Sequence, residues 1–183
     1  GRERMIRLTR GMQEVFARLE TLPKVTLAEL GGAALGGGFE LALACDLRLA
    51  GASARLGLPE ARLGLLPAAG GTQRLTRICG EAAARRLILG AERVAGEEAV
   101  ALGLAHWCVP DAELAARARA LARAVAELPP AALAAGKHCI GVAVSSGGNG
   151  FEEELAASAR LLALPETQRR VARFLEKTPS CGD

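Results

Sequence analysis

The sequence predicts an α/β fold followed by an all-helical C-terminal region. Short apolar segments that favour β-strands alternate with amphipathic segments that favour helices, and glycines cluster between them. Beyond Pro129-Pro130 only helical patterns remain. Of the 183 residues, 50% are hydrophobic, so the chain can bury a core of ordinary size, and this composition excludes a disordered or fibrous protein.

The N-terminal part predicts helix, strand, glycine turn and helix, in that order. Apolar residues recur three and four positions apart before Pro23, which favours a helix over residues 9–22: Met12, Val15, Phe16 and Leu19. A stretch that favours a strand follows at 25–30. Glycines at 31–32 and 36–38 then lead into an apolar helix over residues 39–45.

The same alternation continues along the rest of the chain. We expect strands at 46–50, 54–58 and 105–109, and helices at 72–79, 81–89, 97–102 and 111–128. Asp111 belongs to a residue type that caps helix N-termini, so it is the expected N-cap of the last of these helices. The C-terminal helices are expected at 131–140, 151–162 and 166–177, with a glycine-rich loop at 145–150. The chain therefore divides into a core at 1–129 and a helical region at 130–183.

Charge, aromatic content and cysteine usage exclude several function classes. The formal net charge is +3 with both signs mixed along the chain, and aromatic residues make up 3%, so nucleic-acid binding is not expected. The five cysteines form no CxxC pair, and His106 and His138 have no acid or cysteine at metal-ligand spacing. We therefore expect no disulfide framework and no metal. No apolar run reaches the roughly 18 residues of a membrane span, so a soluble protein in a reducing compartment is expected.

A glycine triplet, Gly36-Gly37-Gly38, runs directly into the apolar helix and is the first candidate site. Backbone N–H groups at such a helix start can hold an oxyanion; a phosphate is the competing ligand, but neither a P-loop ending nor a GxGxxG spacing is present. Glu40 lies in the first turn of this apolar helix, either as an acid favoured by the helix dipole or as a catalytic group. Glu60, at the turn after Pro59, is either a pocket acid or a surface glutamate.

Several spaced segments, in order, resemble the enoyl-CoA hydratase/isomerase (crotonase) superfamily, and most of all an enoyl-CoA hydratase. They are ALGGGFELALACD at 34–46, GLPE at 57–60, GLLP at 64–67, GGTQRL at 70–75, the AxxxGL element at 99–104 and FLEK at 174–177. The resemblance implies the family's fold, a spiral of ββα units whose helical C-terminal region, here 130–183, serves oligomerisation into trimers or pairs of trimers. It also implies that about the first third of the family fold would lie upstream of Gly1.

The resemblance further implies the reaction and its main residues. The substrate would be an acyl thioester of coenzyme A, with no separate cofactor, in the cytoplasm or the mitochondrial matrix of a eukaryote. Gly37 matches the middle glycine whose N–H forms half of the family's oxyanion hole; the other half would lie upstream of Gly1. Glu40 and Glu60 match the two glutamates of members that hydrate 2-trans-enoyl-CoA in the β-oxidation of fatty acids. Glu40 would take the proton of water and Glu60 would protonate the α-carbon, or these roles are exchanged.

Further substrate contacts are implied less directly: Gly36, Pro59, Leu66, Pro67, Gly70, Phe174 and Lys177. Phe174 and Lys177 resemble residues that reach a neighbouring subunit's acyl-CoA site. Two alternatives stay open. One is another reaction of the same family on an acyl-CoA, such as double-bond isomerisation or thioester hydrolysis, and the other is a non-enzymatic RNA-binding relative.

Overall fold

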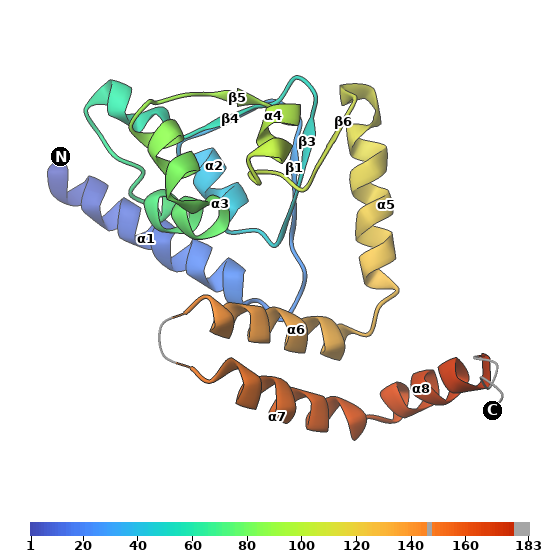
Figure 1. The fold of residues 1–183 in the computed structure, drawn as a ribbon. Helices are drawn as coiled ribbons and strands as arrows, with labels where there is room; N and C mark the ends of the chain where they lie inside the picture. The colour runs from blue at the N-terminus through green and yellow to red at the C-terminus, as the bar shows by residue number, and fades with distance from the viewer. Residues whose placement is uncertain (146–147, 178–183) are drawn as a thin grey trace. The chain divides into compact units, whose positions relative to one another are not determined.

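The computed structural model describes residues 1–145 and 148–177, the last without its side chain, and it divides into two compact units, Gly1–Val125 and Ala126–Asp183. Strands and helices alternate in the first unit, whereas the described elements of the second are helices (Figure 1). The expected α/β class with a helical C-terminal region is therefore confirmed. The expected role of residues 130–183 in oligomerisation stays a prediction.

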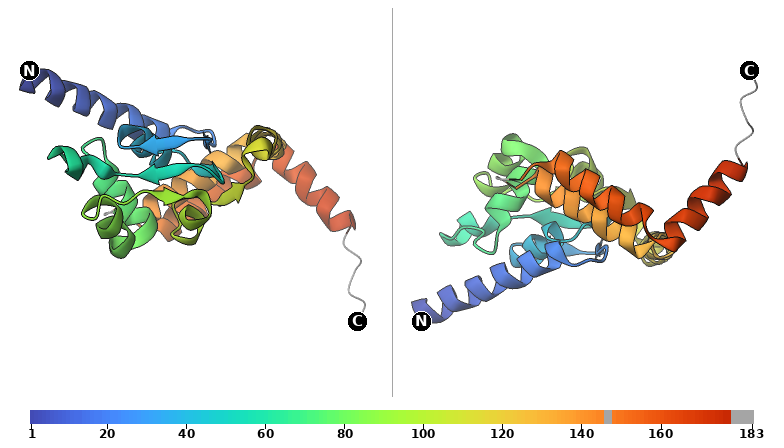
Figure 2. Two further views of the ribbon diagram at one scale, coloured as in Figure 1. Left: turned by 90° about the horizontal axis from the view of Figure 1, so that it is seen from above. Right: turned by 90° about the horizontal axis from the view of Figure 1, so that it is seen from below.

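Helix α1 (Arg2–Thr21) begins well before the expected residue 9. Residues 2–8 of this helix are exposed, and this part extends away from the sheets in both views of Figure 2. Met5 and Leu8 continue the helical spacing of Met12 toward the N-terminus, but charged residues alternate with them, so this part was not expected to be helical. In the later part, Phe16 is buried with Ala44 and Ala69, and Met12 and Leu19 lie against them as expected. Val15, the fourth residue of the expected apolar stripe, is exposed instead.

Two three-stranded sheets form the centre of the first unit. In one, β1 (Leu27–Leu30) and β6 (Trp107–Val109) pair in parallel with β3 (Leu47–Gly51). In the other, β2 (Ala33–Leu35) pairs in parallel and β5 (Val94–Ala95) antiparallel with β4 (Arg55–Gly57). The expected strands are all present; β2 and β5 were not expected, and both are very short.

The helices of the first unit follow the expected order, with adjusted ends. They are α2 (Gly37–Leu43), α3 (Gly71–Ile88), α4 (Gly96–Ala101) and α5 (Leu114–Ala126), with 3₁₀ turns η1 (Pro59–Leu63) and η2 (Asp111–Glu113). Gly80 interrupts α3 with φ 80° and ψ 168°, so the two helices expected at 72–79 and 81–89 are both present.

The expected N-cap role of Asp111 is wrong. Asp111 lies inside η2, ahead of α5, and its Oδ1 accepts a hydrogen bond from the backbone N–H of Ser53 at 3.1 Å. This long-range bond ties the turn after β3 to the segment that leads into α5. The carboxylate accepts a hydrogen bond from a distant backbone N–H rather than from one of its own helix, and the local sequence does not reveal which partner it has.

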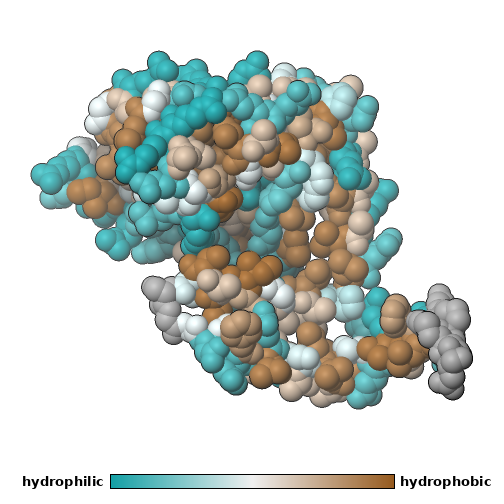
Figure 3. All heavy atoms as spheres, viewed as in Figure 1, coloured by the Kyte–Doolittle hydropathy of each residue, from teal (hydrophilic) through white to brown (hydrophobic). Residues whose placement is uncertain are grey.

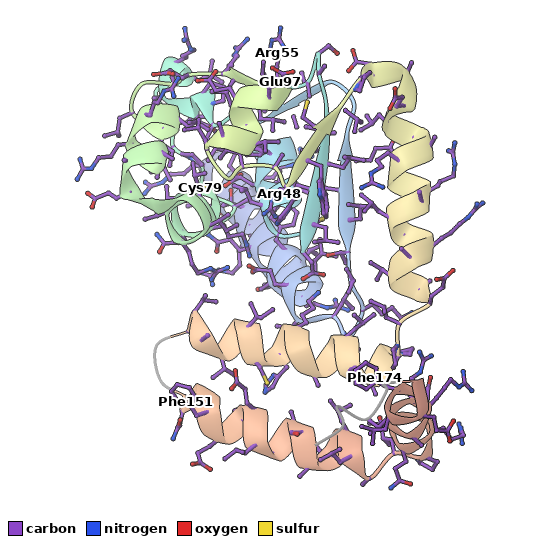
Figure 4. All side chains as sticks on the ribbon, turned by 45° about the vertical axis from the view of Figure 1, so that its right-hand side comes forward. Arg48, Arg55, Cys79, Glu97, Phe151 and Phe174 are labelled. Atoms are coloured by element: carbon purple, nitrogen blue, oxygen red, sulfur yellow. The ribbon has the colours of Figure 1, made fainter. Side chains whose placement is uncertain are left out.

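The core of the first unit is apolar, and the guanidinium of Arg48 is buried within it. Its large, fully buried side chains include Phe39, Leu43, Leu56, Leu58, Leu75, Leu87 and Leu104. Arg48 is also buried, next to Cys79 (Figure 4), and donates to the backbone oxygens of Leu104 and Cys45, both at 2.8 Å. Burial lowers the pKa of Arg48. These carbonyl contacts satisfy the guanidinium and join β3 to the segments beside it.

The second unit contains α6 (Pro130–Ala143), α7 (Gly150–Leu162) and α8 (Pro165–Lys177), which confirms the three helices expected there. His138 of α6 lies 3.3 Å from a carboxylate oxygen of Glu153 in α7. Residues 146–147 of the expected glycine-rich loop lie outside the described residues. Hydrophobic side chains are exposed on these helices, as the brown surface of Figure 3 shows. In the part of the chain that is described, no helix is long and apolar enough to cross a bilayer.

Candidate active site

A cavity of about 460 Å³ lies in the first unit, where α1 meets the residues around the starts of α2, η1 and α3. Its lining comes from distant parts of the chain: Met5, Ile6, Thr9, Arg10, Met12, Gln13, Gly37, Glu40, Glu60, Leu65, Leu66, Ala68 and Ala69. Among these are the two glutamates and the middle glycine that the sequence singled out. The cavity is thus largely apolar, with two carboxyl groups in its wall.

Gly36 forms the corner at which strand β2 turns into helix α2. Its φ of +55° and ψ of −130° favour glycine, and its oxygen accepts the N–H groups of Phe39 and Glu40, both at 2.9 Å. A Cβ at this position would lie 3.1 Å from Oε1 of Glu60. The absence of a side chain at Gly36 therefore permits the turn and leaves room for the Glu60 carboxyl group.

Gly37 is the first residue of α2 and lines the cavity. The N–H of a first helical residue has no partner within its own helix, and the preceding Gly36 has no side chain that could cap it. The methyl group of Met12 packs close by, 3.1 Å from where a Cβ of Gly37 would lie. A backbone amide thus stands at the cavity wall next to an apolar side chain of α1.

Glu40 is buried, with 3% of its surface exposed, yet it belongs to the cavity wall. Its Oε1 accepts the backbone N–H of Gly71 at 2.7 Å. Burial raises the pKa of Glu40, and the charge of Glu60 adds to this, while the Gly71 N–H and the charge of Arg74 act in the opposite direction. The carboxyl group of Glu40 is therefore fixed by the Gly71 amide, and it binds its proton more tightly than an exposed glutamate does.

Glu60 lies in η1, is half-buried, and lines the same cavity. Its Oε2 is buried and has no hydrogen-bond partner among the described residues. A buried carboxyl oxygen without a partner is costly, so a proton, a water molecule or a ligand group is expected there. Glu60 is therefore no ordinary surface glutamate, and it faces the cavity together with Glu40.

The other residues expected to touch substrate are placed in different surroundings. Leu66 lines the cavity and is exposed. Pro59 begins η1, Pro67 is buried, and Gly70 faces Arg74, and these three are not part of the cavity lining. Phe174 is 69% exposed on α8 in the second unit, and the side chain of Lys177 lies outside the described residues.

Several residues of the site were not expected from the sequence. Met12 was assigned to a core-facing stripe of α1, although it also lines the cavity beside Gly37. Gln13 donates from Nε2 to the backbone oxygen of Ala68 at 2.6 Å and so joins α1 to the cavity wall. Gly71 supplies the amide that holds Glu40. The glycine pair before a helix and the family segment GGTQRL both pointed to Gly71, but neither reveals that its partner is Glu40.

Comparison with known proteins places the chain in a family. The profile of the enoyl-CoA hydratase/isomerase family matches residues 4–180. A probable mitochondrial enoyl-CoA hydratase 2 of Arabidopsis thaliana is 37% identical over 167 residues, covering 91% of this chain and 56% of the relative. A probable enoyl-CoA hydratase of Bacillus subtilis is 48% identical over 123 residues, covering 67% of this chain and 48% of the relative. The chain thus spans about half the length of the curated relatives it matches.

Solved structures agree with this result. An enoyl-CoA hydratase from Bacillus anthracis superposes with a TM-score of 0.92 at 34% identity, over 97% of this chain and 69% of that one. DspI of Pseudomonas aeruginosa gives a TM-score of 0.91 at 39% identity, over 97% and 68% of the two chains. The expected crotonase-like fold is therefore confirmed. By its profile, its relatives and its fold, the chain belongs to the enoyl-CoA hydratase/isomerase (crotonase) superfamily.

Proposed function

We propose that the protein is an enoyl-CoA hydratase, which adds water reversibly across the double bond of a 2-trans-enoyl-CoA. One observation carries the proposal: Glu40 and Glu60 line one cavity together with Gly37, and Oε2 of Glu60 is buried there with no hydrogen-bond partner in the described part of the chain. Addition of water needs one group that accepts a proton from water and one that gives a proton to carbon. Two carboxyl groups at one cavity can supply both.

The amide of Gly37 would bind the carbonyl oxygen of the thioester. As water attacks the β-carbon, electrons move through the α-carbon onto this oxygen, and an N–H donor stabilises the resulting negative charge. One such donor contributes about 2.7–4 kcal/mol to the stability of a transition state.

Glu40 would act as the base and Glu60 as the acid. The raised pKa of Glu40 makes its carboxylate a better proton acceptor, and the N–H of Gly71 keeps it oriented while the water proton is transferred. Glu60 would give a proton to the α-carbon from Oε2, which has no hydrogen-bond partner among the described residues, or the two acids exchange these roles. The pair of acids then holds the same number of protons as before, with one proton on Glu40 in place of the one that Glu60 gave up. Transfer of that proton from Glu40 to Glu60 completes the cycle.

The same proposal covers the substrate, assembly and location. Coenzyme A would enter as part of the substrate, with no separate cofactor, and the protein would work as a homotrimer or a pair of trimers in the β-oxidation of fatty acids. The names of the relatives support this substrate class, and the Arabidopsis relative is described as mitochondrial. A cytoplasmic or mitochondrial-matrix location is therefore proposed.

The test is hydration of crotonyl-CoA, followed by the loss of the enoyl-thioester absorbance and by the mass of the product. We expect Glu40→Gln and Glu60→Gln each to lower kcat by at least about 100-fold, the scale of general acid–base catalysis. Glu14→Gln, an exposed substitution on α1 outside the cavity lining, is the matched control and should keep full activity.

Unchanged activity in both cavity variants would refute the assignment. A product of unchanged mass would identify an isomerase instead, and release of free coenzyme A thiol a thioester hydrolase. Each of these outcomes keeps the family and replaces the reaction.

A further inference from the structure

We propose that Arg74 is a positioning residue for the hydration reaction: together with Glu20 it holds the turn at residues 69–71 in the place where the Gly71 N–H meets Glu40. The inference rests on the function proposed above. It concerns a residue that the sequence contains within GGTQRL but to which the mechanism so far gives no role.

Arg74 joins three parts of the first unit. Its Nη1 donates to the backbone oxygen of Ala69 at 2.9 Å, and its Nη2 lies 2.6 Å from Oε2 of Glu20 on α1. The guanidinium carbon lies 5.9 Å from the ring centre of Phe16, also on α1. The Arg74 side chain is 8% exposed. One buried cation therefore fixes α1 and the 69–71 turn to the helix α3 on which it stands.

Gly70 makes this arrangement possible. Its φ of +107° lies in the region that favours glycine, and Nη1 of Arg74 lies where a side chain of residue 70 would begin. Gly70 thus admits the guanidinium to the turn. This contact gives a physical reason for a glycine here that does not require contact with substrate.

The turn that Arg74 holds is the one that orients Glu40. The backbone amides of Gly71 and Ala69 both lower the pKa of Glu40, and the charge of Arg74 acts in the same direction. Gln13 binds the neighbouring oxygen of Ala68, so α1 holds two successive carbonyl groups of this segment, one directly and one through Arg74. A shift of the turn would move the amide away from the carboxylate that is to accept the proton.

Packing alone does not account for Arg74. Its Nε is buried and has no hydrogen-bond partner among the described residues, which costs stability. Replacement of a buried ion pair by apolar side chains is often neutral or stabilising, so stability gives little reason for a charge at this position. The contact to Ala69 and the charge near Glu40 give a functional reason for an arginine at position 74.

The test compares Arg74→Met with Arg77→Met. Arg77 binds the other oxygen of the same Glu20 at 2.6 Å, but its side chain is 40% exposed. We expect Arg74→Met to lower kcat for crotonyl-CoA about 100-fold with little change in KM, since small misplacements cost that much. The acid limb of the kcat profile should move to higher pH. Arg77→Met should leave both unchanged.

Further variants keep the outcome decisive. Arg74→Lys retains the charge but not the two-pronged contact, so we expect the pH limb to return toward that of the unmodified protein while kcat recovers only in part. If Arg74→Met does not fold, Glu20→Gln weakens the same contact in a milder way and should shift kcat in the same direction. A folded Arg74→Met protein with unchanged kcat and pH limb would overturn the proposal, as would equal effects of Arg74→Met and Arg77→Met.

Failure of the proposed function can be distinguished from failure of this inference. If the unmodified protein does not hydrate crotonyl-CoA, the titration of Glu40 can still be followed by carbon NMR of labelled carboxyl groups. Arg74→Met should then raise the pKa of Glu40, because it removes a positive charge and loosens the turn. An unchanged titration would refute the role of Arg74 whatever the reaction is.

Discussion

At the residue scale, Glu40 links pH to stability. Its pKa is raised above the ordinary value of 4.5, mainly by burial. The unfolded chain therefore releases this proton at a lower pH than the folded protein does. The stability that Glu40 contributes is fully present below about pH 4.5 and is lost as the pH rises through its folded pKa.

Glu40→Gln should therefore raise the free energy of unfolding at pH 7, by about 1.4 kcal/mol for each unit of pKa shift, while it removes activity. The glutamine oxygen can still accept the N–H of Gly71, so the contact is preserved. Urea denaturation at pH 7 and pH 4 measures the effect, and the advantage should vanish at pH 4. A variant that is less stable than the unmodified protein at pH 7 would contradict this account.

Glu60 contributes to the same titration through its charge. Glu60→Gln keeps the shape of the side chain but removes the repulsion between the two acids, so the pKa of Glu40 should fall. Burial, the largest cause of the raised pKa, is unchanged in this variant. Carbon NMR of labelled carboxyl groups follows the titration of Glu40 in both proteins. If Glu40 titrates identically in the two proteins, the two carboxyl groups do not interact.

At the scale of elements, Gly80 interrupts α3 in a conformation that is nearly restricted to glycine. No atom lies within 4 Å of a Cβ built on Gly80, so a substitution there tests the backbone alone. Gly80→Ala should lower the free energy of unfolding by about 1–3 kcal/mol. Chemical denaturation measures this cost.

Gly11→Ala is the matched control, because Gly11 also has open space around it but lies inside the helix α1. It should raise the free energy of unfolding by about 0.5–1 kcal/mol through helix propensity. Equal and small effects of the two substitutions would mean that Gly80 can be replaced without strain.

The elements that could be predicted are those whose own residues show an apolar repeat of helical or strand period. The strands and helices with apolar repeats are present, whereas β2, with three residues, and β5, with two, depend on their partner β4. The start of α1 was placed too late because charged residues alternate with the apolar ones in its first turns. Asp111 was assigned to a local cap, although its partner is the distant Ser53. Contacts across the fold decide these cases, and no local pattern contains them.

At the scale of the whole molecule, parallel pairing brings the two acids together. Leu35 of β2 lies opposite Gly57 of β4, so the residues that follow both strands leave the same edge of the sheet. Gly36 and Glu60 meet there, and α2 begins beside them. Spacing along the sequence could not show this proximity; the family resemblance pointed to it. The part played by α1 and Arg74 depends on tertiary packing and was not predicted.

The assembly can be tested on the exposed apolar side chains of the second unit. Phe151 is 79% exposed, Leu155 66% and Ile140 69%, and Figure 3 shows the hydrophobic surface to which α6 and α7 contribute. Large exposed apolar patches are typical of surfaces that bind another protein. Because a trimer or a pair of trimers is proposed, a second copy of the chain is the expected partner.

Analytical ultracentrifugation should therefore give a mass of three or six chains. The double substitution Phe151→Glu with Leu155→Glu should shift the protein toward the monomer, because each carboxylate would have to lose its hydration water in the interface. Leu89→Glu is the control: Leu89 is 70% exposed at the end of α3 in the first unit, and its substitution should leave the mass unchanged. A monomeric unmodified protein at micromolar concentration would refute the assembly. Dissociation by Leu89→Glu alone would place the interface on the first unit instead.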